Sequence, residues 1–185
     1  MESQTLMILV IAVVAVLGIA MWAYLNRQNR EKLKQLFGPE YERTVEETGD
    51  PAKADDILRK RVARVDRFKL RPLNRQQADA FTEQWRRVQA RFVDDPDAAV
   101  SEADNLVTQV MTARGYPLED FERRAEDVSV DHPRVVENYR TAKGLIERRA
   151  RGDAGTEELR QAVVNYRALF DDLLDVEDRQ RRRAS

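Results

Sequence analysis

The 185-residue chain contains no cysteine and a single histidine, His132. Without cysteine there are no disulfides and no thiolate chemistry, and one histidine cannot build a zinc site that needs several histidine or cysteine ligands. The sequence also lacks a glycine-rich phosphate loop, a GxSxG motif and an HExxH motif. We therefore do not expect an enzyme, a bound cofactor or a metal, and we assign no catalytic residue from sequence.

Patterns typical of β-strands are also missing. No stretch alternates apolar and polar residues over the length of a strand, and β-branched clusters are absent outside the N-terminal apolar run. The seven glycines and six prolines fall mostly between periodic segments, where they are typical of helix boundaries. The sequence predicts an all-α fold.

Charge is missing altogether from residues 6–25, which read LMILVIAVVAVLGIAMWAYL. A helix needs roughly 20 apolar residues to cross a hydrocarbon core of about 30 Å, and this run has that length. Trp22 and Tyr24 lie at its C-terminal end, where amphipathic aromatic side chains favour the headgroup region. The run predicts a transmembrane helix in a lipid bilayer.

The charges beside this run predict its direction. No lysine or arginine precedes it, whereas Arg27, Arg30, Lys32 and Lys34 follow it closely. An excess of lysine and arginine marks the cytoplasmic flank, so we expect the N-terminus outside and the rest of the chain in the cytoplasm. The same four side chains are candidates for contact with anionic lipid.

A cleaved signal peptide is the alternative interpretation of the apolar run. Gly18-Ile19-Ala20 offers small residues before a cleavage point. However, no lysine or arginine precedes the run, and the run is longer than the roughly 7–15 apolar residues that are usual in a signal peptide. Cleavage would leave a periplasmic or secreted helical domain, and that alternative stays open.

The part after the apolar run is dense in charge but neutral overall. Of the 33 acidic residues only Glu2 precedes Arg27. Arg27 is the first of the 32 basic residues, so all of them lie after the apolar run. A nucleic-acid-binding surface needs clustered excess positive charge, so we expect no nucleic-acid partner. The arginines of the tail, Arg179 and Arg181–Arg183, form a local exception that we interpret as a solvated terminus.

Apolar residues beyond the run recur at spacings of three and four, which is typical of amphipathic helices. Asp50-Pro51, Asn74 and Asp94-Asp95-Pro96 are predicted helix starts, Thr156 is a predicted cap, and Gly115 is a predicted helix end. The predicted apolar stripes are Ala54, Leu58, Val62, Val65; Ala78, Phe81, Trp85, Val88, Phe92; Val100, Ala103, Val107, Val110; Leu118, Phe121, Ala125, Val128; Val135, Tyr139, Ala142, Ile146; and Leu159, Val163, Tyr166, Phe170, Leu173.

Five or six such helices with short turns predict a helical bundle, since each helix must bury one stripe. The predicted organisation is a short extracytoplasmic N-terminus at 1–5, the transmembrane helix at 6–25, a juxtamembrane helix and linker at 26–50, a cytoplasmic helical bundle at 51–176 and a charged tail at 177–185.

Asp131-His132-Pro133 is the strongest candidate in the sequence for a catalytic segment, because it contains the single histidine next to a carboxylate. One hypothesis makes His132 a general base tuned by Asp131. The structural alternative is a helix start, with Asp131 as N-cap and Pro133 in the first turn, where it needs no N–H. We favour the helix start, with His132 packed or facing water.

Other candidate sites also have a structural explanation. The acidic clusters Asp55-Asp56, Asp94-Asp95-Asp97 and Asp171-Asp172-Asp175 do not follow an EF-hand loop, and we interpret them as solvated ion pairs. The stripe around Trp85-Arg86-Arg87 could form a peptide groove, but an aromatic stripe at helical spacing is more typical of a core.

Five strings of the sequence are distinctive together: LFGPEYERTV (36–45), WRRVQARFVDDP (85–96), RGYPLEDFE (114–122), SVDHPRVVENYR (129–140) and LRQAVVNYRALFDDLL (159–174). They resemble an uncharacterised family of bacterial membrane-anchored proteins over nearly the whole part after the apolar run. The resemblance implies a bacterial source. It implies no activity and no functional residue.

These observations together favour a single-pass inner-membrane protein whose helical bundle binds another protein, as a scaffold or adaptor. The alternative from a different class is an enzyme with a composite carboxylate site, which would need several carboxylates gathered in a deep pocket. The sequence does not identify the protein partner.

Overall fold

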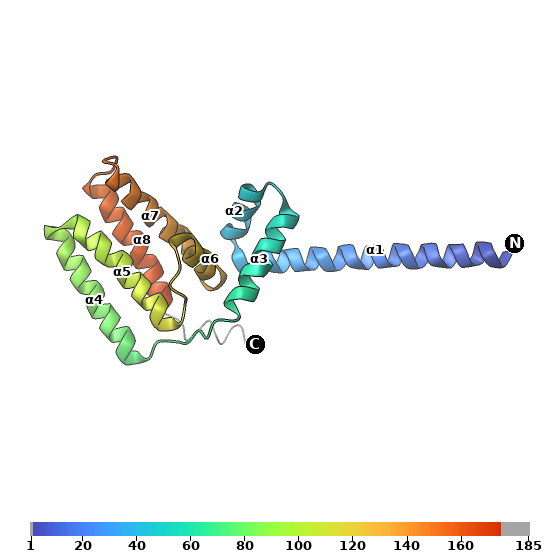
Figure 1. The fold of residues 1–185 in the computed structure, drawn as a ribbon, viewed down its shortest axis with the longest axis horizontal. Helices are drawn as coiled ribbons and strands as arrows, with labels where there is room; N and C mark the ends of the chain where they lie inside the picture. Colours follow the sequence, from blue (N-terminus) through green and yellow to red (C-terminus); the bar gives the residue numbers. More distant parts are fainter. Residues whose placement is uncertain (1, 175–185) are drawn as a thin grey trace.

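The computed structural model describes residues 2–174, with the side chains of residues 2–6, 8–14 and 22 outside the described part. Every regular element in this range is an α-helix (Figure 1), which confirms the predicted all-α class. The charged tail predicted at 177–185 lies outside the described residues. The eight helices are α1 (Glu2–Phe37), α2 (Pro39–Thr48), α3 (Pro51–Val65), α4 (Arg75–Asp94), α5 (Pro96–Arg114), α6 (Phe121–Asp131), α7 (Val136–Ala150) and α8 (Thr156–Leu174).

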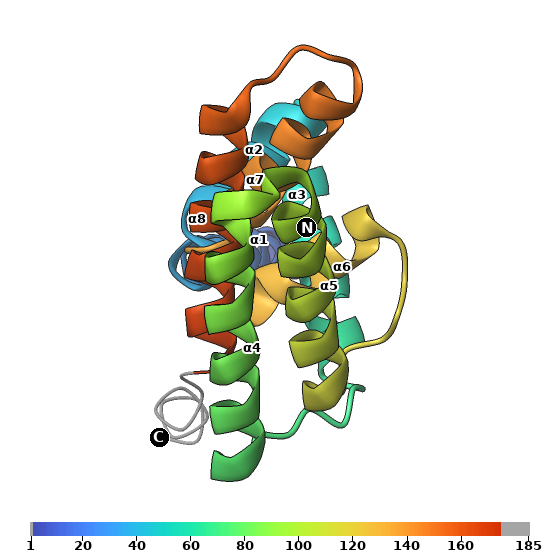
Figure 2. The ribbon, with the colours of Figure 1, turned by 90° about the vertical axis from the view of Figure 1, so that its left-hand side faces the viewer.

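The first helix, α1, is uninterrupted, and its two ends have different surroundings. Its N-terminal part projects away from all other helices (Figures 1 and 2), and Val16 and Ile19 there are 64% and 66% exposed. Its C-terminal end is packed, with Phe37 fully buried. Gly38, at a φ of 52°, follows the last residue of α1, and Pro39 is the first residue of α2.

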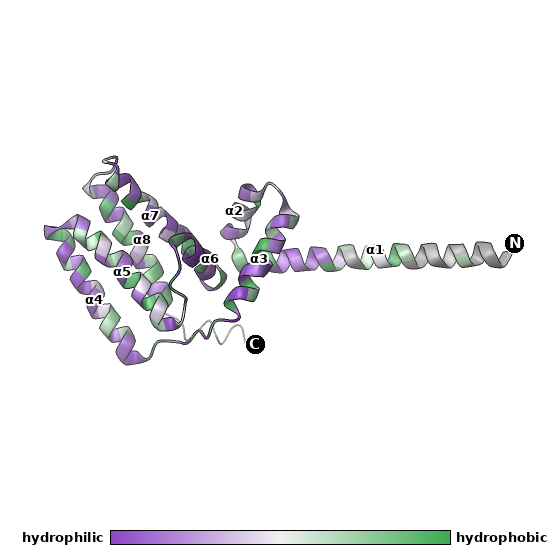
Figure 3. Cartoon of the chain, viewed as in Figure 1, coloured by the Kyte–Doolittle hydropathy of each residue, from purple (hydrophilic) through white to green (hydrophobic). Residues whose placement is uncertain are grey.

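Hydropathy changes along α1 at the point where it enters the folded body (Figure 3). Among the residues that the structure describes, no helix combines the length and the apolar character needed to span a membrane. Residues 8–14, in the middle of the predicted span, have side chains outside that set.

The helices from α4 to α8 form a helical bundle around the larger of two apolar cores. In this bundle α5 lies between α4 and α8, and α7 packs on the other side of α8 (Figure 1). Trp85 and Phe170 meet in its centre with ring centroids 4.8 Å apart. The stripes predicted on α5 and α8 supply most of its wall, because all of their members except Val163 are buried.

The smaller core lies where α1 ends. It is built by Leu33, Phe37, Tyr41, Leu58, Val65 and Val130. Four of the six residues come from the C-terminal end of α1 and from α3, and Val130 is contributed by α6. The first three helices therefore form a unit of their own, and α6 is the helix of the bundle that contacts both α1 and α3.

The helix starts follow the predicted side-chain chemistry. Asp50 Oδ1 accepts from the Ala52 N–H at 2.8 Å, and Asp95 Oδ1 accepts from the Ala98 N–H at 3.0 Å. Asn74 and Gln77 form a reciprocal capping box at 2.8 and 3.0 Å. These caps satisfy backbone donors that have no partner inside the helix.

The sequence predictions about the starts of α6 and α8 are wrong. Leu118 is 70% exposed because α6 begins only at Phe121, after Asp120 accepts from the Arg123 N–H at 2.9 Å. Thr156 is the first residue of α8 rather than its cap. The preceding Gly155 N–H is instead satisfied by the Glu158 carboxylate at 2.9 Å.

Replacement of Trp85 by alanine should lower the free energy of unfolding by about 3–5 kcal/mol, since the side chain is fully buried and its removal leaves a cavity. Val93→Ala on the same helix is the matched control, because Val93 is 83% exposed. Urea-induced unfolding of the detergent-solubilised chain measures both. Equal midpoints for the two variants would contradict the buried position of Trp85.

Candidate functional site

His132 lies at the end of α6, where its side chain is 1% exposed. Its Nδ1 is 2.6 Å from Asp172 Oδ2 on α8, and its Nε2 is 2.9 Å from an Arg114 terminal nitrogen on α5. A guanidinium can only donate, so Nε2 accepts and Nδ1–H donates to Asp172. This pairing requires the neutral imidazole.

Arg114 is a buried cation, 3% exposed. Besides His132 it donates to the Leu173 carbonyl oxygen at 3.4 Å, and its guanidinium lies over the Tyr116 ring at 5.8 Å. Burial lowers the pKa of Arg114, because the low-dielectric surroundings disfavour its charged form. The imidazole of His132 thus connects a buried guanidinium to the carboxylate of Asp172.

This arrangement corrects the predicted helix start at Asp131. Asp131 is the last residue of α6, and its carboxylate accepts from the Tyr116 hydroxyl at 3.0 Å. The next helix begins at Val136 without a side-chain cap. Proline at 133 lies in the turn between the helices, where the His132 carbonyl oxygen accepts from the Val136 N–H at 3.2 Å.

A general base must reach the proton that it abstracts. Both ring nitrogens of His132 are engaged and the side chain is buried, so the geometry favours a structural role for this residue. The network ties the ends of α5, α6 and α8 together.

The acidic clusters are separated by the fold. Asp55 is buried, whereas the neighbouring Asp56 faces outward and pairs with Lys60 at 2.7 Å. Asp95 caps α5, and Asp97 accepts from Arg149 through both oxygens at 2.8 Å. Within the described part of the chain no group of three or more potential metal ligands converges.

Asp171 and Asp172 also diverge. Asp171 accepts from Arg167 at 2.7 Å on the surface of α8, while Asp172 accepts from His132. Asp175 lies outside the described residues. The stripe around Trp85-Arg86-Arg87 contributes to the core, as favoured from the sequence. Trp85 is fully buried under the Arg167 guanidinium, which lies 5.3 Å from the ring centroid.

Of the four basic residues that follow the apolar run, one is paired with a buried carboxylate, one lies near an aromatic ring, and two are exposed. Arg30 donates to the buried Asp55 carboxylate at 3.0 Å, and this hydrogen bond raises the pKa of Arg30. Tyr41 donates to the same carboxylate at 2.9 Å, and burial, with this bond, raises its pKa to about 12. Lys34 lies 5.5 Å from the Tyr41 ring centroid, and Arg27 and Lys32 remain exposed.

A charge network that the sequence did not predict joins α1–α3 to the bundle. At its centre is Glu40 of α2, which is 3% exposed. Arg61 of α3 donates to Oε1 at 2.7 Å, while Arg140 of α7 donates to Oε2 at 2.6 Å and to Oε1 at 2.9 Å. One carboxylate therefore holds two guanidinium groups from opposite sides, and we call this network the ionic junction.

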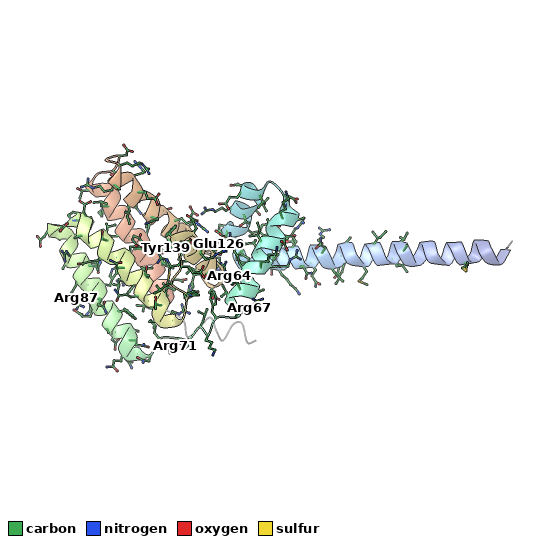
Figure 4. All side chains as sticks on the ribbon, viewed as in Figure 1. Arg64, Arg67, Arg71, Arg87, Glu126 and Tyr139 are labelled. Atoms are coloured by element: carbon green, nitrogen blue, oxygen red, sulfur yellow. The ribbon has the colours of Figure 1, made fainter. Side chains whose placement is uncertain are left out.

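The second half of the ionic junction lies between α3 and α6. Arg64 donates to Asp127 at 2.6 Å and to Glu126 at 3.3 Å, and Arg61 reaches Glu126 at 3.4 Å. Figure 4 shows Arg64 and Glu126 at the boundary between α3 and the bundle. Burial raises the pKa of Asp127, and the hydrogen bond from Arg64 opposes that rise.

One sequence signal pointed to the ionic junction. Arg61 occupies the position between Leu58 and Val65 on the apolar stripe of α3, three residues from one and four from the other. A charge on such a stripe is buried only when it is paired. Its partners Glu40 and Glu126 are distant in sequence, so no local pattern identified them.

Comparison with protein-family models, with characterised proteins and with solved structures found no match to this chain.

Glu40→Ala should destabilise the chain by about 3–5 kcal/mol, because it leaves two buried guanidinium groups without their shared carboxylate. Glu42→Ala, on the exposed face of the same helix, is the control and should be close to neutral. Urea-induced unfolding of the detergent-solubilised chain compares them. A loss below about 1 kcal/mol for Glu40→Ala would show that the ionic junction contributes little.

The contact between His132 and Arg114 is tested by a double-mutant cycle. His132→Leu alone should cost about 1–3 kcal/mol, since it leaves the buried guanidinium without its acceptor. Arg114→Leu removes that cation, so the double variant should lose less than the sum of the two single losses. Strict additivity in the same unfolding assay would exclude a direct energetic coupling.

Proposed function

We propose that this protein is a single-pass membrane protein whose helical bundle binds another protein at the membrane surface, as a scaffold or adaptor. The observation that carries the proposal is the 20-residue uncharged run, placed on a helix that projects away from the folded body (Figure 1). Apolar side chains that project into water are unfavourable, and a bilayer removes them from it.

The described part of the run supports this proposal. Val16, Leu17, Ile19 and Met21 are each at least 60% exposed and touch no other helix. Among the described residues no other helix covers them, and a bilayer would provide the apolar surroundings that they lack. A lipid bilayer fits the length of the run better than a protein groove does.

The direction of insertion follows from the flanking charge. Lysine and arginine are absent before the run and frequent after it, which favours a cytoplasmic bundle. Arg27 and Lys32 are exposed next to the run and are the best candidates for anionic headgroups. The resemblance to bacterial membrane-anchored proteins supports the inner membrane as the location.

We favour a binding role because the fold fixes the position of the bundle relative to α1. The end of α1 is fixed to α3 by the Arg30–Asp55 pair, and the ionic junction fixes α3 to the bundle. A surface on the bundle would therefore be held at a defined distance from the membrane. Such a device suits a scaffold or adaptor.

Fractionation of a bacterial host that expresses the chain tests the anchor. The wild type should sediment with membranes, resist high salt and dissolve in detergent. Val16→Arg with Ile19→Arg should move it to the soluble fraction, because each arginine near the centre of a span costs roughly 2.5–3.5 kcal/mol. Val93→Arg with Val164→Arg, at exposed positions on α4 and α8, is the control and should stay with the membrane.

Reporter fusions at the C-terminus decide the orientation in the same strains. An active alkaline phosphatase fusion together with a dark cytoplasmic fluorescent fusion would place the bundle outside and contradict the proposed direction. Affinity purification of the full chain from solubilised membranes then tests binding. Recovery of one protein in near-equal amount supports the scaffold role, and recovery of none contradicts it.

A further inference from the structure

The segment around the end of α3 is strongly basic in a chain whose net charge is only −1. Between residues 59 and 75 there are eight basic residues and one acidic residue, Asp66. The basic residues are Arg59, Lys60, Arg61, Arg64, Arg67, Lys69, Arg71 and Arg75. The structure assigns different surroundings to them.

Three of these cations have partners on α3 itself or in the ionic junction. Arg61 and Arg64 pair with carboxylates of α2 and α6, and Lys60 pairs with Asp56 at 2.7 Å. Arg67, Lys69 and Arg71 lie between α3 and α4 and are exposed. Among the described residues, no carboxylate lies within ion-pair distance of these three.

The three exposed cations alternate with apolar residues. Phe68 and Leu70 are half-buried and pack against both apolar cores, whereas Arg67, Lys69 and Arg71 point outward. Arg67 lies in the turn that ends α3, where its N–H donates to the Arg64 carbonyl oxygen at 3.1 Å, and the chain from Lys69 to Asn74 has no regular secondary structure. Figure 4 shows Arg67 and Arg71 on the same side of the molecule. We call Arg67, Lys69 and Arg71 the cationic row.

The backbone of the cationic row is held in place. The Arg71 N–H donates to the Arg114 carbonyl oxygen at 2.9 Å, and the Arg71 guanidinium donates to the Ala113 carbonyl oxygen at 3.2 Å. The Lys69 carbonyl oxygen approaches Gly115 so closely that a Cβ there would lie 2.8 Å away. The backbone of the row is therefore held in place, so less chain entropy is lost when a partner binds.

We propose that the cationic row binds an acidic segment of a protein partner. The three exposed cations have no carboxylate partner among the described residues, so the carboxylates of such a segment would complement their charge. The inference rests on the proposed role as a protein-binding module, but it does not depend on the membrane anchor.

Two other polyanions fit the row less well. Single-stranded nucleic acid is usually bound with aromatic side chains that stack on bases, and Phe68, the aromatic residue within the row, is turned toward the cores. A bilayer is reached through α1, while the row lies on the segment that runs away from α1 toward α4 (Figure 1). An acidic peptide requires neither stacking nor proximity to lipid.

Fluorescence anisotropy of the detergent-solubilised full chain tests the proposal. The probe is a labelled peptide of alternating glutamate and threonine, and a lysine–threonine peptide is its control. The row variant carries Arg67→Gln, Lys69→Gln and Arg71→Gln. The matched control carries Lys53→Gln, Arg87→Gln and Arg134→Gln, three exposed cations without an ion pair to a described residue.

The row variant should bind the glutamate peptide about 10-fold more weakly, whereas the matched control should change less than about 2-fold. A variant with Arg67→Lys and Arg71→Lys should retain binding, because it keeps the charge. Equal losses in row and control variants would overturn the proposal. So would tighter row-dependent binding of a single-stranded oligonucleotide or of anionic vesicles. Membrane association is measured separately, so a failure here leaves the anchor test unaffected.

Discussion

The arrangement of the helices depends on the ion pairs between the Glu40 carboxylate and two arginines. The carboxylate is nearly inaccessible to water, and Arg61 and Arg140 approach it from α3 and α7. Two apolar cores lie on either side of this contact, and each core is built mostly by its own helices. The orientation of the bundle relative to α1 is therefore set largely by ion pairs, with Val130, Phe68 and Leu70 as the main apolar contributions.

An ionic contact of this kind fixes direction better than it adds stability. Desolvation of three charged groups offsets much of their attraction, so apolar residues of the same shape would serve stability equally well. Arg140, however, binds both oxygens of Glu40 in a forked geometry, and that geometry tolerates little rotation. For a chain that extends one long helix away from its body, a fixed direction determines where the bundle faces.

Local chemistry made much of this fold predictable from the sequence. Asp50, Asn74 and Asp95 cap helices as predicted, because the cap and its backbone partner are only two or three residues apart. Asp131 has the same local pattern, but its carboxylate accepts a hydrogen bond from the Tyr116 hydroxyl, fifteen residues earlier, and does not cap a helix. The partners of Glu40 and His132 are equally remote: Arg140 follows Glu40 by 100 positions and Asp172 follows His132 by 40. Only the tertiary fold brings such pairs together.

The cationic row escaped prediction for a different reason. Pro72 and the lack of helical periodicity over residues 69–73 are typical of a connection between helices, and no local pattern there indicates a binding site. Overall neutrality then concealed the local excess, since acidic residues elsewhere balance it. In the folded chain Arg61 and Arg64 form ion pairs in the ionic junction, whereas the three cations of the row have no carboxylate partner among the described residues. Net charge therefore describes this protein poorly, because the fold, and not the composition, determines which charges remain available to a partner.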